Sequence, residues 1–179
     1  MRISNLSFSY ENKKVFDHFN LEFEDGITCL MGPSGSGKTT LLKLIAGLLK
    51  PDEGVIENSH DKISFMFQED RLLPWLSVRD NILLVSDDAR KTDELLELLE
   101  IDGNLKISEL SGGMARRVSL IRCLVFESNM ILLDEPFKGM DPELMKKAAE
   151  LIIREKKPVI VSTHSIEEVQ ALKGRIVNL

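Results

Sequence analysis

The segment 32–39 constrains the fold of this chain more than any other part of the sequence. It reads Gly-Pro-Ser-Gly-Ser-Gly-Lys-Thr and matches the phosphate-binding pattern G-x-x-x-x-G-K-[ST] at every position. An apolar run at 27–31 precedes it and is typical of a buried strand, and residues 40–46 follow with helical periodicity. A strand, a glycine loop and a helix in this order can point several backbone N–H groups at one phosphate chain. We therefore predict a nucleotide-binding α/β domain.

The residue types in this loop suit a triphosphate and its metal ion. Glycines let the loop turn tightly and let phosphate approach the backbone. Lys38 is expected to pair with the β- and γ-phosphates, and the Thr39 hydroxyl to ligate Mg²⁺. The alternative is a glycine-rich turn without a ligand, which the Lys-Thr pair at this offset disfavours. The predicted nucleotide contacts are Gly32, Pro33, Ser34, Gly35, Ser36, Gly37, Lys38, Thr39 and Thr40.

The composition excludes several classes of protein. With 179 residues, 43% apolar and 29% charged, the chain has the make-up of one ordinary globular domain. A net charge of −6 argues against nucleic-acid binding, which needs a basic surface. The longest apolar stretch, 41–49, contains Lys43 and is too short to cross a bilayer, so no direct membrane span is expected. Cys29 and Cys123 lie in apolar runs without metal-ligand spacing, and we expect both to be buried.

The apolar pattern changes along the chain. Residues up to about 23 alternate with a period of two, which is typical of antiparallel strands. The runs 130–134 and 158–162 are instead almost continuously apolar, as in strands buried on both faces of a parallel sheet. We predict a single α/β domain over 1–179, with a mainly parallel core sheet, an N-terminal antiparallel β subdomain and a helical insertion at about 69–126.

Two carboxylates, Asp134 and Glu135, follow the apolar run that ends at Leu133. Asp134 stands where a Mg²⁺-organising carboxylate belongs in a phosphate-loop nucleotidase. Glu135, one residue further, is well placed to polarise a water for attack on the γ-phosphate. Acidic turns after strands are common, so this interpretation depends on the phosphate loop being present as well.

A second glycine segment, Leu110-Ser111-Gly112-Gly113-Met114, precedes a helix that contains several arginines. A Ser-Gly-Gly at a helix N-terminus can bind an anion, or it can be a flexible cap. Together with the phosphate loop and the acidic pair, in this order, the segment resembles the ATP-binding subunits of ABC transporters. The resemblance spans essentially all 179 residues. It implies a P-loop NTPase fold, ATP hydrolysis, and ATP and Mg²⁺ as cofactors.

The resemblance assigns roles to further residues. Gln68 matches the Q-loop residue that reaches Mg²⁺ and the attacking water, and His164 matches the switch histidine that contacts the γ-phosphate. Asp141 matches the D-loop, and Tyr10 stands where an aromatic ring stacks on adenine, although a plain surface tyrosine is the alternative. The implied catalytic residues are Glu135, His164 and Gln68, and the implied metal ligands are Thr39, Gln68 and Asp134.

The resemblance also implies two protein partners. In this family two subunits hold two ATP molecules head to tail, so Ser111, Gly112 and Gly113 would touch the γ-phosphate held by Lys38 of a second copy. Residues 68–81 resemble a segment of nitrate, sulfonate and taurine importer ATPases that docks a permease helix. We therefore expect an exposed apolar patch at 72–76, a transmembrane permease as partner, and a peripheral location on the cytoplasmic face of the membrane. Packing within the helical insertion is the alternative for these apolar residues.

Some residues depart from the family pattern or match no motif. Met114 replaces the usual glutamine and cannot make the hydrogen bonds of an amide, and Lys138 adds a charge near the D-loop. His18 and His60 match no motif, and we expect both to be exposed to solvent. A soluble ABC-type ATPase without a transport role and an ATP-sensing module with weak hydrolysis stay open as alternatives. The transported solute is not readable, because this subunit would not touch it.

Overall fold

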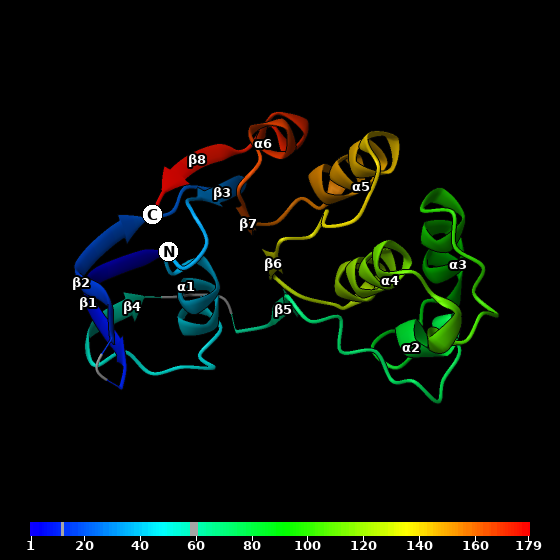
Figure 1. Cartoon of the computed structure of the whole chain (residues 1–179), viewed down its shortest axis with the longest axis horizontal. Helices are drawn as coiled ribbons and strands as arrows, with labels where there is room; N and C mark the ends of the chain where they lie inside the picture. The colour runs from blue at the N-terminus through cyan, green and yellow to red at the C-terminus, as the bar shows by residue number, and fades with distance from the viewer. Residues whose placement is uncertain (12, 58–60) are drawn as a thin grey trace.

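The computed structural model describes residues 1–11, 13–57 and 61–179. They form two sheets with helices packed around them (Figure 1). The strands are β1 (Arg2–Tyr10), β2 (Lys13–Glu22), β3 (Ile27–Met31), β4 (Glu53–Glu57), β5 (Ile63–Met66), β6 (Met130–Asp134), β7 (Val159–Thr163) and β8 (Arg175–Asn178). The helices are α1 (Lys38–Ile45), α2 (Val78–Leu83), α3 (Ala89–Leu98), α4 (Gly112–Val125), α5 (Pro142–Arg154) and α6 (Ile166–Leu172), with a 3₁₀ turn at Ile107–Glu109.

The larger sheet has the strand order β5-β6-β7-β3-β8, and every neighbouring pair is parallel. β6 and β7 are buried along their whole length, as their continuous apolar sequences predict. Because the strands are parallel, the loops that follow β3, β5, β6 and β7 leave the sheet at the same edge. These loops contain the phosphate-binding segment, Gln68, Glu135 and His164. The strand order therefore places the predicted site residues at one edge of the sheet.

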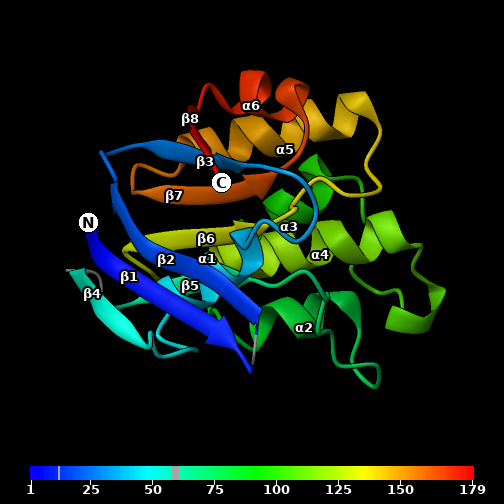
Figure 2. The same ribbon diagram turned by 60° about the vertical axis from the view of Figure 1, so that its left-hand side comes forward.

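The smaller sheet has the order β2-β1-β4 and is antiparallel, which confirms the expected N-terminal β subdomain. Its apolar face packs against α1 in one core cluster that includes Leu6, Phe16 and Leu41. Figures 1 and 2 show this sheet on the α1 side of the molecule, with α2, α3 and α4 on the opposite side. The phosphate loop therefore lies between the β subdomain and the rest of the parallel sheet.

The helical insertion packs into a second core cluster, in which Val78, Leu95 and Leu120 represent α2, α3 and α4. Side chains cap α2 and α3: Ser77 accepts from Asp80 N at 3.1 Å and Asp88 accepts from Lys91 N at 2.8 Å.

The expectation of an exposed apolar patch at 72–76 is confirmed for Pro74 and Trp75, whereas the three leucines of the segment are half-buried. Asn81 is fully buried, and its side-chain amide makes two hydrogen bonds to the backbone of Leu73. Its Oδ1 accepts from Leu73 N at 2.8 Å, and its Nδ2 donates to Leu73 O at 3.1 Å. Leu72 packs against the core cluster of the insertion. Trp75 is 74% exposed and the adjacent Pro74 is also exposed, so these two residues contribute most to the apolar surface of the segment.

Both cysteines are buried, as expected, and burial raises the pKa of each thiol to about 11. They are therefore protonated and unreactive at neutral pH. His18 is exposed, also as expected, whereas His60 lies outside the described residues. In the part of the chain that the structure describes, every helix is too short or too polar to cross a membrane.

Candidate nucleotide site

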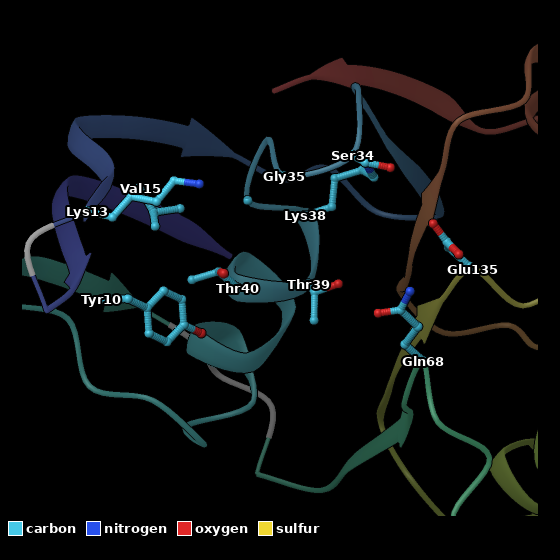
Figure 3. Close-up of a pocket in the computed structure, with 11 residues that line it drawn as sticks. Tyr10, Lys13, Val15, Ser34, Gly35, Lys38, Thr39, Thr40, Gln68 and Glu135 are labelled. Carbon is cyan, nitrogen blue, oxygen red and sulfur yellow. The ribbon is translucent and has the colours of Figure 1, made fainter.

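A cavity of about 290 Å³ opens at the carboxyl edge of the parallel sheet (Figure 3). It brings together residues from the β subdomain, the phosphate loop and the loops after β5 and β6. Its lining residues are Tyr10, Lys13, Val15, Ser34, Gly35, Gly37, Lys38, Thr39, Thr40, Gln68 and Glu135. All of them except Lys13 and Val15 are residues that the sequence predicts for the site.

The phosphate loop turns through two left-handed glycines, with φ of +83° at Gly35 and +101° at Gly37. Gly37 also has no room for a side chain, because a Cβ there would lie 2.9 Å from both Val15 and Phe16 of β2. This contact places β2 against the loop and brings Lys13 and Val15 into the cavity. The sequence carries no pattern that signals such a contact between a strand and a distant loop.

Two polar groups of the loop have the chemistry that a phosphate requires. Lys38 is only 7% exposed, and its ammonium donates to the carbonyls of Gly32 and Pro33 at 2.7 and 2.9 Å. The Ser36 hydroxyl is buried without a hydrogen-bond partner among the residues that the structure describes. An ammonium and an unpaired hydroxyl beside the N-terminus of α1 form a site for an anion.

The predicted metal ligands also lie together. Thr39 Oγ1 donates to Asp134 Oδ2 at 2.7 Å, and Ser162 Oγ donates to Asp134 Oδ1 at 2.5 Å. Gln68 points into the same cavity from the loop after β5 (Figure 3). A hydroxyl, a carboxylate and an amide oxygen are the ligand types that Mg²⁺ binds when phosphate and water complete its shell. The residues present therefore fit this ion.

Glu135 sits directly after β6 with a left-handed backbone, φ +50°. Its N–H donates to Ser162 Oγ at 3.0 Å, so one β7 serine holds both members of the acidic pair. The Glu135 side chain lies on the cavity wall across from Lys38 (Figure 3), and its Oε1 is 3.8 Å from His164 Nδ1. The histidine side chain is 72% exposed and does not line the cavity.

The loop that carries His164 has a support that the sequence does not reveal. Thr163 donates a hydrogen bond to Glu168 of α6, and the same hydroxyl accepts from Ser165 N at 3.0 Å. Ser165 in turn caps α6 by accepting from Glu168 N at 3.3 Å. Burial raises the pKa of Glu168, whereas the bond from Thr163 opposes that rise. Residues on both sides of the histidine are thus fixed.

The segment Ser111-Gly112-Gly113, at the N-terminus of α4, lies outside the cavity of its own chain. Ser111 caps α4 by accepting from Met114 N at 3.2 Å. Gly113 packs against the D-loop so closely that a Cβ there would lie 2.3 Å from Gly139 O. Asp141 caps α5, and the hydrogen bond from Leu144 N is the main cause that lowers the pKa of its carboxyl. In this chain Ser111-Gly112-Gly113 therefore packs against the D-loop, and neither segment lines the cavity that contains Lys38.

Comparison with known proteins fits this geometry. The family profile described as ABC transporter matches residues 16–138. The chain is 39% identical over 187 residues to the aliphatic sulfonates import ATP-binding protein SsuB 1 of Rhodococcus jostii, covering 97% of this chain and 76% of that protein. It is 34% identical over 204 residues to the taurine import ATP-binding protein TauB of Jannaschia sp., covering 99% and 76%.

A solved structure agrees in fold and extent. The dimeric structure of MJ0796, a bacterial ABC transporter cassette, matches with a TM-score of 0.85 and 29% identity, covering 99% of this chain and 93% of that one. The resemblance read from the ordered motifs, including the sulfonate and taurine importer branch, is confirmed. The chain belongs to the ABC transporter family, as one of its ATP-binding subunits, and it is an ATPase.

Proposed function

We propose that this chain drives an importer by binding MgATP in the described cavity, closing on a second copy around two ATP molecules, and passing the motion to a permease. The observation that best supports this proposal is that the nucleotide site of one chain is incomplete. Lys38, Gln68 and Glu135 meet in one cavity, whereas Ser111 and Gly113 lie outside it. A γ-phosphate held by Lys38 therefore has one side left for another molecule to contact.

The two ends of the cavity bind different parts of the nucleotide, the phosphates at one end and adenine at the other. The backbone of the phosphate loop, Lys38 and Ser36 take the phosphates. Tyr10 is 44% exposed at the opposite end, where its ring stands edge-on to Phe8 with centroids 4.9 Å apart. That packing leaves a ring face for adenine, with Val15 as an apolar neighbour in the cavity.

Thr39, Asp134 and Gln68 hold the metal in this proposal. Bound Mg²⁺ supplies neutralisation of the charge that develops on the β- and γ-phosphates. Glu135 accepts a proton from the water whose oxygen attacks the γ-phosphorus, and the bond to the β-phosphate oxygen breaks to leave ADP and phosphate. His164 keeps the Glu135 carboxylate directed at that water from its position 3.8 Å away.

The second copy completes the electrostatic cage. Ser111 presents a hydroxyl, and Gly112 and Gly113 present the first backbone N–H groups of α4, which suit the open side of a γ-phosphate. Ser111 and Gly112 are exposed in this chain and Gly113 is half-buried, so the tip of α4 is open to a neighbour's nucleotide. Hydrolysis removes the phosphate that joins the two copies, so the closed dimer loosens.

A mixing experiment tests this arrangement. Lys38→Ala and Ser111→Arg subunits should each be nearly inactive alone, because each spoils both sites of its own dimer. Mixed dimers contain one site with Lys38 and Ser111 both intact, so an equimolar mixture should recover about a quarter of wild-type phosphate release by random pairing. The control is Lys38→Ala mixed with the double variant Lys38→Ala/Ser111→Arg, which forms no intact site. A mixture no more active than this control would reject the head-to-tail site.

In this proposal the permease binds the segment 68–81. The buried Asn81 at the end of this segment holds it in place through the backbone of Leu73. Trp75 projects from this segment with 74% of its surface exposed. An exposed aromatic ring on a rigidly held turn is a typical anchor for a pocket on a partner protein. In this proposal the permease holds the subunit at the cytoplasmic face of the membrane.

Replacing Trp75 with alanine should abolish recovery of this chain with its permease while changing its own ATPase rate by less than about twofold, because the loss of an interface anchor acts on binding and not on chemistry. The measurement is co-purification in detergent after co-expression with the permease subunits of the same transporter. Val55→Ala is the matched control, since Val55 is also exposed, at 57%, but belongs to β4 on the other side of the molecule. Equal recovery of both variants would remove Trp75 from the interface.

A further inference from the structure

Arg116, in the second turn of α4, is 3% exposed and donates to two loops at once. Its Nη1 donates to Phe67 O at 2.7 Å, to Gln68 O at 3.2 Å and to Asp70 Oδ1 at 3.0 Å. Its Nε donates to Glu135 O at 3.0 Å, and its Nη2 donates to the Asp134 carbonyl. One guanidinium therefore contacts the backbone of both Gln68 and Glu135.

Two neighbours on the same face of α4 bind the same loop further along. Ser119 Oγ donates to Asp70 O at 2.9 Å, and Arg122 donates to Asp70 O at 3.1 Å and to Arg71 O at 3.0 Å. The spacing of three residues aligns these side chains along one face of the helix. Their partners lie beyond Gln68, which makes them structural contacts for comparison with Arg116.

The chemistry of the guanidinium explains why these contacts fix geometry. It is planar and presents its N–H donors in a rigid fork, so it sets both the distance and the angle between the carbonyls it binds. A lysine ammonium at this position is a point charge on a flexible stem and cannot hold the same set together. Buried carbonyls also cost free energy when unpaired, so the fork keeps both loops in one arrangement.

We propose that Arg116 is a positioning residue for ATP hydrolysis, which holds the backbones of Gln68 and Glu135 in the register that aims both side chains at one water and one metal ion. The inference rests on the roles proposed above for those two residues. Arg116 does not line the nucleotide cavity and makes no hydrogen bond to Lys38 or Tyr10. Its loss should therefore slow the chemical step and spare nucleotide affinity.

The test compares Arg116→Lys with Arg122→Lys. Arg116→Lys should lower kcat by at least about tenfold and change KM for ATP by less than about threefold, because a small displacement of catalytic groups costs rate more than binding. Arg122→Lys loses the same chemical group from the same helix and should keep kcat within about twofold. Both are assayed well below their unfolding temperatures, which thermal melts establish first.

Two further variants keep the test decisive. Arg116→Gln serves if the lysine variant unfolds, and it should show the same loss of kcat at unchanged KM. Ser119→Ala removes a contact from the same face of α4 but leaves the carbonyl contacts of Arg116, so its kcat should stay within about twofold of wild type. Wild-type kcat in both folded Arg116 variants, or losses equal to those of Arg122→Lys or Ser119→Ala, would overturn the inference.

Glu135→Gln is assayed in parallel to separate the two proposals. If it hydrolyses ATP at the wild-type rate, the proposed catalytic role of Glu135 fails, whatever Arg116 does. If it is inactive while both Arg116 variants are normal, only the positioning role fails.

Discussion

Replacing Glu135 with glutamine is expected to lower ATP hydrolysis by about a thousandfold, because a neutral amide cannot accept the proton of the attacking water. ATP binding should survive, since the phosphate loop and the Asp134 contacts are untouched. The change is isosteric, and the backbone N–H of residue 135 keeps its bond to Ser162 Oγ. Because the bound ATP is not hydrolysed, the closed ATP-bound dimer of this variant should accumulate.

Two measurements check this expectation: phosphate release, and size-exclusion chromatography with and without ATP. The dimer should appear for Glu135→Gln with ATP and disappear with ADP. Glu167→Gln is the matched control, because Glu167 is a nearby glutamate that is exposed on α6 and does not line the cavity. A Glu135→Gln subunit that turns over ATP as fast as this control would exclude Glu135 as the base.

The parts of the site that sequence could predict are those built from short, local patterns. The phosphate loop is one continuous segment, and Asp134 and Glu135 directly follow an apolar strand. The parallel sheet could also be predicted, since strands buried on both faces must be apolar throughout. Once these strands are parallel, their following loops must share an edge. The proximity of Gln68, Lys38 and Glu135 follows from that topology.

Contacts between distant segments could not be predicted in the same way. In the sequence Arg116 is one of several arginines in the helix that follows Ser111-Gly112-Gly113, and no local pattern assigns it a partner. The structure buries it, because the loops after β5 and β6 converge on that face of α4. Leu72 likewise reads as part of an apolar surface, and only the hydrogen bonds of Asn81 to Leu73 show why the segment turns inward.

The alanine variant of Lys38 is expected to weaken ATP binding by about a hundredfold or more, because it removes a charge-assisted contact with two phosphates from a buried site. The surrounding fold should persist. The Lys38 ammonium is held only by the carbonyls of Gly32 and Pro33 among the described residues, and α1 does not depend on it for capping.

Titration calorimetry with ATP and Mg²⁺ measures this loss, and a thermal melt confirms that the variant is folded. Lys13→Ala is the matched control, because Lys13 lines the same cavity from β2 but belongs to the β subdomain and not to the phosphate loop. Its affinity should fall by less than about tenfold, as for a partly solvated charge. If the two variants bound ATP equally well, general positive charge in the cavity would hold the phosphates. The geometry of the glycine loop, which directs one lysine at the β- and γ-phosphates, would then have no special part in recognition.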